Sequence, residues 1–321
     1  MLRKIVPVAV VGALALAGCS NSNKPSTAAT APNHKIVVGF SVYDMQYQYF
    51  QSMEAGTKAA ILAKGWGYKL ADEKSDENQM VTGAEALIDQ GVDVLIISPF
   101  KPSALGPIIA KAKAKGVPVI VDDIGGGGAP YDAIVVSDNS GGGTLAADYM
   151  AKQIAANGNA SKNVASITCE PSAVYAARRN AAFKTEIQKL GYTVVAELSG
   201  NSAADQGYKV MKDILAKNPD VAGVFSCNDP MAVAAGNAIK DAGKNPVTGI
   251  VTVGFNGDPE ALTAIKAGGL SATVAQDPTT MGALTVKLAD EALAKQAIAF
   301  DNATEREVFN PVQLINKDNV K

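Results

Sequence analysis

Short apolar runs alternate along the chain with longer segments in which apolar residues recur every three or four positions. Residues 36–40 form such a run, and Phe50, Met53, Thr57 and Ile61 show the helical spacing of the segment that follows it. We expect strands at 36–42, 68–71, 93–97, 118–122, 133–137, 164–169, 192–197, 222–226, 250–255 and 271–276. Continuous apolar strands with helices between them indicate parallel sheets covered on both faces. The predicted fold class is therefore α/β.

A weak internal repeat divides the chain into two similar halves. Residues 91–98 (GVDVLIIS) resemble residues 219–226 (PDVAGVFS), and each segment contains the third expected strand of its half. The chain has 321 residues, and 47% of them are apolar. A chain of this length usually folds around more than one hydrophobic core. We therefore expect two doubly wound parallel-sheet lobes joined after about residue 138. The segment 302–321 is too short for a third domain and is expected to pack on both lobes.

The first residues have the pattern of an export signal. A basic start at 1–4 is followed by an apolar run over 5–18, which is shorter than the roughly 20 residues that a membrane-spanning helix needs. The end of this run, Leu16-Ala17-Gly18-Cys19, resembles the lipobox of bacterial lipoproteins; by that resemblance 1–18 is a lipoprotein signal peptide and Cys19 is lipidated. Residues 19–34 are rich in Ser, Asn, Thr, Ala and Pro, and we expect them to form a flexible tether.

Polar side chains follow most of the expected strands. They are Ser41, Tyr43, Asp44, Ser98, Asp122, Asp123, Glu170, Asn228, Asp229, Asn256, Asp258, Gln276 and Asp277. An aromatic residue, Phe100, also follows one of these strands. Ligands of open parallel sheets bind beyond the carboxyl ends of the strands. Capping of the next helix explains any single member of this set equally well. The accumulation over both halves, with aromatic rings at one end, favours a polar uncharged ligand.

Charge and the scarcity of catalytic groups argue against several functions. The chain has 29 basic and 31 acidic residues without a basic block, which argues against nucleic acid as a partner. The single histidine, His34, lies at the end of the tether, so no Ser-His or Cys-His pair can form. The glycine runs 125–128 and 141–143 fit neither G-x-G-x-x-G nor a Walker motif, and we assign them to a surface loop and to close helix packing. We expect no enzyme, no cofactor and no metal.

Besides Cys19, two cysteines remain after the expected export, and each closes an expected strand. Cys169 and Cys227 could form a disulfide in an oxidising compartment. Ordinary buried thiols are more frequent at such positions, so we expect the two cysteines to be unpaired.

A series of short motifs runs in order along nearly the whole mature chain. They are Tyr49-Phe50 before a helix containing Gly56; Gly116-Val117-Pro118-Val119-Ile120 followed by Asp123; Ser137-Asp138-Asn139; Ala176-Ala177-Arg178-Arg179 before Phe183; Asn228-Asp229 with Met231-Ala232; Gly254-Phe255-Asn256-Gly257; and Ala275-Gln276. Together they resemble the substrate-binding proteins of bacterial sugar ABC transporters, of the type I periplasmic-binding fold, and most of all the ribose-binding group.

This resemblance implies two lobes joined by a three-stranded hinge that close on a sugar. The crossovers are then expected near Asp138, Gln276 and residues 306–309. The N-terminal lobe becomes 35–137 plus 277–306, and the C-terminal lobe becomes 138–276 plus 307–321. The implied protein is an exported, membrane-anchored lipoprotein and a monomer, which presents a sugar or polyol to an ABC permease.

The resemblance also implies a ligand-binding set. Tyr49 and Phe50 correspond to rings that stack on the sugar face, Asp123 to a carboxylate that accepts from hydroxyls, and Arg179 to a donor toward ring and hydroxyl oxygens. Amide side chains both donate and accept, as a hydroxyl does. The predicted set is Ser41, Asp44, Gln46, Tyr47, Tyr49, Phe50, Asp123, Arg179, Asn228, Asn256 and Gln276.

Four positions depart from the ribose-binding pattern and leave the ligand open. Tyr47 replaces the usual asparagine, Ile124 an arginine, Ser202 an aromatic residue and Asn256 an aspartate. A pentose, a hexose, a deoxysugar or a sugar alcohol fits equally well. The alternative functions are a ligand sensor that feeds a receptor kinase or chemoreceptor, and a binder of a furanose-like signal molecule.

Overall fold

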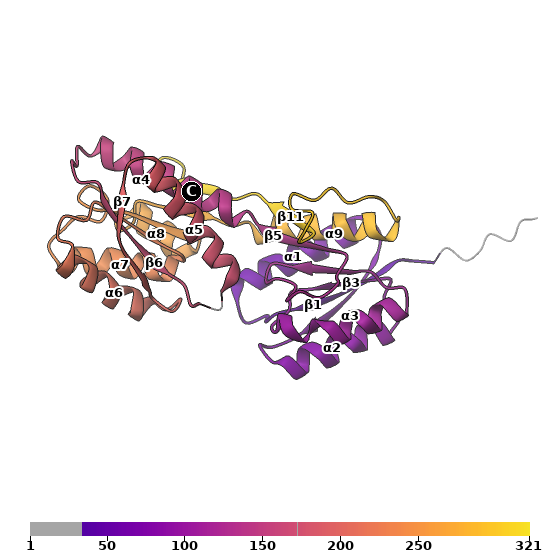
Figure 1. Cartoon of the computed structure of the whole chain (residues 1–321). Coiled ribbons are helices and arrows are strands. Elements are labelled where there is room, and N and C mark those ends of the chain that lie inside the picture. The colour runs from indigo at the N-terminus through magenta and orange to yellow at the C-terminus, as the bar shows by residue number, and fades with distance from the viewer. Residues whose placement is uncertain (1–33, 172) are drawn as a thin grey trace, which may run out of the picture. The chain divides into compact units, whose positions relative to one another are not determined.

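Two six-stranded sheets organise the chain (Figure 1). The computed structural model describes residues 34–171 and 173–321, so the expected signal peptide, Cys19 and nearly all of the tether lie outside the described residues. By their contacts, residues 35–321 form one unit that contains both sheets. The presence of two separate sheets with helices between their strands confirms the α/β class and the two-lobe architecture.

The first sheet has the strand order β11-β5-β4-β3-β1-β2, and all its pairings are parallel. Its strands are β1 (Val37–Val42), β2 (Gly67–Asp72), β3 (Val94–Ile97), β4 (Val119–Asp122), β5 (Ala133–Ser137) and β11 (Glu307–Asn310). Its helices are α1 (Gln48–Ala63), α2 (Glu77–Asp89), the short 3₁₀ turn η1 (Pro102–Ala104), α3 (Leu105–Ala114) and α9 (Pro278–Leu293).

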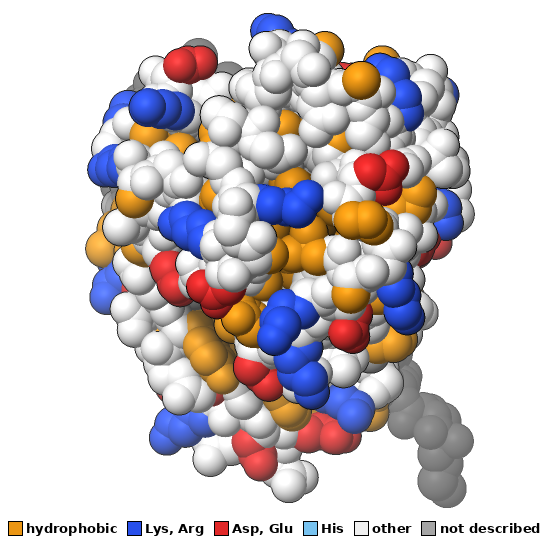
Figure 2. Space-filling view, turned by 90° about the vertical axis from the view of Figure 1, so that its left-hand side faces the viewer, with side chains coloured by type: hydrophobic (Ala, Val, Ile, Leu, Met, Phe, Trp, Pro, Cys, Tyr) orange, Lys and Arg blue, Asp and Glu red, His pale blue; other side chains and the backbone are white. Residues whose placement is uncertain are grey.

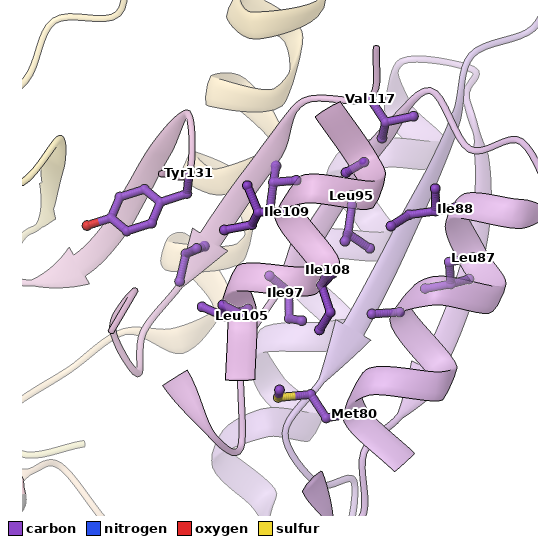
Figure 3. Close-up of a cluster of buried hydrophobic side chains, with 14 of the residues drawn as sticks. Met80, Leu87, Ile88, Leu95, Ile97, Leu105, Ile108, Ile109, Val117 and Tyr131 are labelled. Atoms are coloured by element: carbon purple, nitrogen blue, oxygen red, sulfur yellow. The ribbon is translucent and has the colours of Figure 1, made fainter. Parts of the chain in front are cut away.

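Side-chain alternation along the buried strands explains how helices cover both faces of the first sheet. Leu95 and Ile97 of β3 belong to a hydrophobic cluster with Met80 and Leu87 of α2 and with Ile108 of α3 (Figure 3). The intervening residues of β3, at 94 and 96, belong instead to the cluster formed with α1 and α9. A continuous apolar strand is therefore needed because neither face meets water.

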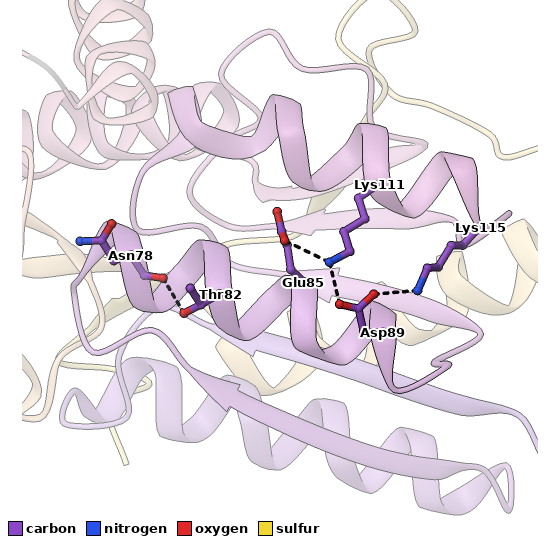
Figure 4. Close-up of polar contacts among 6 residues, drawn as sticks. All are labelled: Asn78, Thr82, Glu85, Asp89, Lys111 and Lys115. Atoms are coloured by element: carbon purple, nitrogen blue, oxygen red, sulfur yellow. Dashed lines mark hydrogen bonds and ion pairs between the residues drawn. The ribbon is translucent and has the colours of Figure 1, made fainter.

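The exposed sides of α2 and α3 carry a small network of charges (Figure 4). The Nζ of Lys111 lies 3.0 Å from Glu85 Oε2 and 2.8 Å from Asp89 Oδ2, and the Nζ of Lys115 lies 2.7 Å from Asp89 Oδ1. Exposed pairs of this kind contribute about 0–1 kcal/mol each. The buried cluster beneath them contributes more to holding the two helices.

The second sheet repeats this arrangement with the order β12-β10-β9-β8-β6-β7. Its strands are β6 (Asn163–Thr168), β7 (Thr193–Ser199), β8 (Gly223–Ser226), β9 (Val251–Asn256), β10 (Ala272–Ala275) and β12 (Gln313–Asn316), of which β12 is antiparallel to β10. Its helices are α4 (Asn139–Ala156), α5 (Val174–Lys189), α6 (Ala204–Lys217), α7 (Asp229–Asp241) and α8 (Pro259–Lys266). The sequence repeat corresponds to β3 and β8, which occupy equivalent positions in the two sheets.

The chain passes between the sheets three times, after β5, after β10 and after β11. We expected residues 307–310 in the C-terminal lobe, but β11 pairs with β5 and Asn310 lies opposite Ser137 in the first sheet. The third crossover therefore lies between β11 and β12, a few residues later than predicted. The backbone N–H of Asp138 donates to the carbonyl of Asn310, at 2.9 Å, and so joins the first and third crossovers.

Figure 2 shows the side of the molecule on which α4, α6 and β7 lie. Acidic and basic side chains are interspersed over this face, and hydrophobic side chains gather in a hollow near its centre. Charges of both signs therefore share this surface, as their even distribution along the sequence predicts.

Candidate ligand-binding site

Four aromatic rings form a cluster where β1 and β3 end in the first lobe. The rings of Tyr43 and Phe50 stack with centroids 4.8 Å apart, and Phe100 lies edge-on to Tyr43 at 5.4 Å. Tyr49 meets Phe50 edge-on at 5.3 Å. Phe50 is buried, with 7% of its surface exposed, so its first role is to support Tyr43. Tyr43 was absent from the predicted set, although it directly follows β1.

Three of the predicted polar residues bond within the first lobe. Asp44 accepts from the backbone N–H of Gln46 at 2.9 Å, from Gln46 Nε2 at 2.7 Å and from the Ser75 hydroxyl at 2.6 Å. The Ser41 hydroxyl donates to Glu73 Oε1 at 2.7 Å. Tyr47, by contrast, is 49% exposed at the start of α1. Ser41, Asp44 and Gln46 thus shape the turn after β1, and a ligand has to share atoms that already have partners.

Glu73 is a buried carboxyl group that the sequence analysis missed. It directly follows β2 and also accepts from the backbone N–H of Phe100 at 2.7 Å. Burial raises the pKa of Glu73 to about 7, although the two hydrogen bonds favour the charged form. The rule that polar residues follow strand ends could have found it. Glu73 connects the ends of β1 and β3 and so fixes the loops that carry the rings.

Asp123 and Tyr49 are brought together by the fold from distant parts of the sequence. The Tyr49 hydroxyl donates to Asp123 Oδ1 at 2.9 Å. Burial raises the pKa of Asp123 to about 6, while the Tyr49 hydrogen bond and Arg179 lower it. Asp123 has a φ of 64°, in the left-handed region that residues other than glycine rarely adopt. Backbone strain of this kind concentrates at ligand sites, which agrees with a binding role for Asp123.

Arg179 is held in the second lobe by three contacts. Its Nε donates to Asn139 Oδ1 at 3.0 Å, and its Nη1 donates to the backbone carbonyl of Cys227 at 2.9 Å. Its guanidinium carbon lies 3.8 Å from the centre of the Phe255 ring. Burial lowers the pKa of Arg179 to about 10, which still leaves the guanidinium charged at neutral pH. Asn139 and Phe255 belong to the motifs quoted above, but their contact with Arg179 depends on the fold.

Two glycines of α4 allow the helix to approach this arginine. A Cβ at position 143 would lie 2.1 Å from the carbonyl oxygen of Arg179, and a Cβ at position 142 would lie 2.6 Å from the Phe255 ring. Close packing of α4 on α5 and on β9 therefore needs glycine at both positions. The expectation that the run 141–143 serves helix packing is confirmed for positions 142 and 143, whereas a Cβ at position 141 would meet the N-cap Asp138.

The three predicted amides mainly organise loops and crossovers. Asn228 caps α7: its Oδ1 accepts from the N–H of Met231 at 3.1 Å and its Nδ2 donates to the Ser202 carbonyl at 3.0 Å. Gln276 Nε2 donates to Asn256 Oδ1 at 3.1 Å beside the second crossover. Asn256 has a φ of 136°, the second unusual backbone among the predicted residues.

The groups of the two lobes interact electrostatically. The carboxylate of Asp123 raises the pKa of Arg179 against the effect of burial, and the arginine lowers that of Asp123 in return. A guanidinium has five N–H donors. In the part of the chain that the structure describes, we find two of them used, by Asn139 and Cys227. An acceptor on one lobe and a charged donor on the other can therefore hold a molecule that carries several hydroxyl groups.

Arg178 connects the same helix to the first lobe. Its Nη1 lies 2.6 Å from Oε1 of Glu307, a fully buried residue of β11, and its guanidinium lies over the Tyr175 ring at 4.5 Å. Tyr175 packs against the hydrophobic cluster of the first lobe and closely approaches Gly125. The start of α5 is thus anchored on the first lobe beside Arg179.

The expectation of two unpaired cysteines is wrong. Cys169 and Cys227 form a disulfide with their Cα atoms 5.6 Å apart. The reason is that β6 and β8 are neighbours in the second sheet, so the residues that follow them lie side by side. This adjacency is a property of the strand order, which the spacing of 58 residues does not reveal.

Residues 34–171 and 173–321 contain neither a metal-binding cluster nor a membrane-spanning helix. No group of three or more His, Cys, Asp or Glu side chains is arranged to hold a metal ion in this part of the chain. No helix in the same range is both long enough and apolar enough to cross a membrane.

Comparisons with known proteins agree with the fold. Residues 38–297 match the family model of the periplasmic binding protein domain. The ribose import binding protein RbsB of Bacillus subtilis (strain 168) is 34% identical over 271 residues, which cover 84% of this chain and 85% of that protein. The xylitol-binding protein of Mycolicibacterium smegmatis is 28% identical over 322 residues, which cover 99% of this chain and 86% of that protein.

A solved structure gives the same result in three dimensions. The periplasmic ribose ABC transporter structure from Conexibacter woesei DSM 14684 superposes with a TM-score of 0.79 at 25% identity, covering 89% of this chain and 93% of that one. The family is one of binding proteins, which agrees with the expectation of a binding protein rather than an enzyme. This chain belongs to the periplasmic binding protein domain family and has its type I fold.

Proposed function

We propose that this protein captures a monosaccharide or a sugar alcohol between its two lobes and delivers it, unaltered, to an ABC permease. The observation that carries the proposal is geometric: Asp123 and Tyr49 are hydrogen-bonded to each other in the first lobe, and a buried arginine, Arg179, is held in place by Asn139 and Cys227 in the second. These groups lie beyond the carboxyl ends of their parallel strands, where open α/β sheets bind ligands.

Each group has a part in recognising a hydroxylated ring. The rings of Tyr43 and Tyr49 offer apolar faces to C–H bonds, the Asp123 carboxylate accepts from hydroxyl groups, and the Arg179 guanidinium donates to oxygen atoms. A ligand that contacts both lobes stabilises the arrangement in which they are close, because only that arrangement makes both sets of contacts. Binding thereby shifts the population toward a form that a permease can recognise.

The relatives support the ligand class and leave the individual ligand open. The curated relatives are named for ribose, for ribose and allose, and for xylitol. Structures of similar chains contain D-allose and D-arabinose. All these ligands are small, uncharged and rich in hydroxyl groups, and hydroxyl groups can donate to Asp123 and accept from Arg179.

Titration calorimetry against ribose, allose, arabinose, xylitol and myo-inositol tests this function. We expect saturable binding of at least one compound, and mass spectrometry should recover that compound unchanged. Replacing Arg179 by Ala should weaken binding at least tenfold, because closure would bury ligand oxygens without their charged donor. The matched control is Lys184→Ala, on the exposed side of the same helix. Absence of binding across the panel would contradict the proposal.

We further propose that the protein is exported and held at the membrane by a lipid on Cys19. The support is the sequence pattern of residues 1–19, with its short apolar run and its lipobox-like end. Metabolic labelling with a radioactive fatty acid should mark the wild-type protein and leave Cys19→Ala unlabelled. Equal labelling of both proteins would refute anchoring through Cys19.

A further inference from the structure

The Cys169–Cys227 disulfide adjoins the candidate site in the second lobe through the backbone of Cys227, whose carbonyl accepts from Arg179. Cys169 follows β6 and Cys227 follows β8, so the bond joins two neighbouring loops at the ligand-facing edge of the sheet. The backbone N–H of Cys227 also donates to the carbonyl of Ile167 at 3.0 Å, which continues the pairing of these strands by one residue. The loop after β8 is therefore fixed to β6 by one hydrogen bond and one covalent bond.

This loop carries one of the three contacts that hold Arg179. The acceptor for Arg179 Nη1 is the carbonyl oxygen of Cys227 itself, at 2.9 Å. The other supports, Asn139 and the Phe255 ring, come from α4 and β9. Asn139 accepts from Nε, the Phe255 ring lies near the guanidinium, and the carbonyl of Cys227 accepts from Nη1. Because the guanidinium is rigid and planar, these three contacts together set where its remaining N–H donors point. A shift of this loop would remove one of the three contacts and leave those donors less firmly placed.

We propose that the disulfide is a positioning device that sets ligand affinity through Arg179. The proposal rests on the proposed function, because it assumes that Arg179 donates to the bound ligand. A preorganised charged donor loses less rotational freedom on binding than a mobile one. Removing the bond should therefore weaken binding while Arg179 itself remains in the chain.

One of the two bridged cysteines is partly exposed. Cys227 is fully buried, whereas Cys169 is partly exposed and lines a cavity of about 400 Å³ together with Glu170, Ala176 and Lys184. A small dithiol can enter a cavity of this size. Dithiothreitol would transfer two electrons and two protons to the bond, leaving two thiols in the protein and becoming a cyclic disulfide itself.

A double-mutant cycle separates positioning from general stabilisation. Affinity for the best ligand of the sugar panel is measured by equilibrium dialysis, at ligand concentrations up to millimolar. Four proteins are compared: the wild type, the double variant Cys169→Ala/Cys227→Ala, Arg179→Ala, and the triple variant. Circular dichroism and thermal melts establish that each is folded at the assay temperature, since loss of the disulfide lowers stability in any case.

We expect loss of the disulfide to weaken binding about tenfold in the wild-type background, which corresponds to the loss of about one well-placed hydrogen bond to a charged group. In the Arg179→Ala background the same change should alter affinity less than about twofold. Equal losses in both backgrounds, or no loss in either, would overturn the proposal. If the double variant does not fold, reduction of folded wild type and of folded Arg179→Ala by dithiothreitol supplies the same comparison.

The proposed function and this inference fail differently. If no member of the sugar panel binds to the wild-type protein, the proposed function is wrong. If the wild-type protein binds a sugar and the cycle shows no coupling between the disulfide and Arg179, the function holds and the positioning role is wrong.

Discussion

Replacement of Glu73 by Gln should make the stability of the first lobe less dependent on pH. Burial raises the pKa of Glu73 from its ordinary 4.5 to about 7. The folded protein then binds this proton more tightly than the unfolded chain does. The stabilising contribution is complete below pH 4.5, is lost as the pH rises from there to about 7, and does not change further above pH 7.

The size of the effect follows from the same pKa values. Each pKa unit corresponds to about 1.4 kcal/mol, so the difference between 4.5 and about 7 is worth about 3 kcal/mol. Glutamine cannot ionise, and its amide can donate to Ser41 while its oxygen accepts from the N–H of Phe100. The free energy of unfolding of Glu73→Gln, relative to wild type, should therefore increase by about 3 kcal/mol between pH 4.5 and pH 8.

Urea unfolding followed by tryptophan fluorescence measures this difference. Trp66 is the single tryptophan and packs against the α1 and α9 side of the first sheet, so its signal reports on the first lobe. The control for the substitution itself is Glu77→Gln, at an exposed position in the first turn of α2. A constant difference for Glu73→Gln would refute the reasoning, since it would mean that the two hydrogen bonds keep Glu73 ionised.

Three further predictions concern the site and the packing around it. The ligand affinity of the wild type should fall as the pH decreases from 7 to 5, because Asp123 protonates near pH 6. Asp123→Asn should bind about tenfold more weakly at pH 7.5, and its affinity measured by calorimetry should depend less on pH than that of the wild type. Gly56→Ala should lower the urea midpoint by an amount equivalent to about 1–3 kcal/mol, because the added Cβ would lie 2.2 Å from the carbonyl oxygen of residue 279. The control Gly106→Ala adds a Cβ on an open helix surface and should not lower the midpoint. Arg178→Ala should destabilise the protein by about 2 kcal/mol in thermal or urea unfolding, because it leaves the buried Glu307 carboxylate without its cation. An unchanged midpoint would show that this ion pair contributes nothing to stability.

The pattern of apolar residues predicted the elements of both sheets closely. The ten expected strands correspond to β1–β10 and differ from the observed bounds by at most two residues at either end. Except for the edge strands β2 and β7, these strands are buried on both faces. Their sequences are therefore nearly continuously apolar and stand out from the amphipathic helices between them. The strands β11 and β12 were not predicted as strands. Each has four residues, begins and ends with a polar one, and forms only through pairing with a strand far away in the sequence.

For the candidate site, the sequence determined which chemical groups follow the strand ends, because a parallel sheet brings these positions to one edge. Their partners were decided by the tertiary structure. Glu73 bonds to Ser41, Tyr49 to Asp123, and Arg179 to a backbone carbonyl that no side-chain pattern can reveal. The disulfide and the backbone conformation at Asp123 likewise depend on which strands become neighbours. Local sequence fixes periodicity and capping, whereas distances between residues that are far apart in the chain depend on strand order and helix packing.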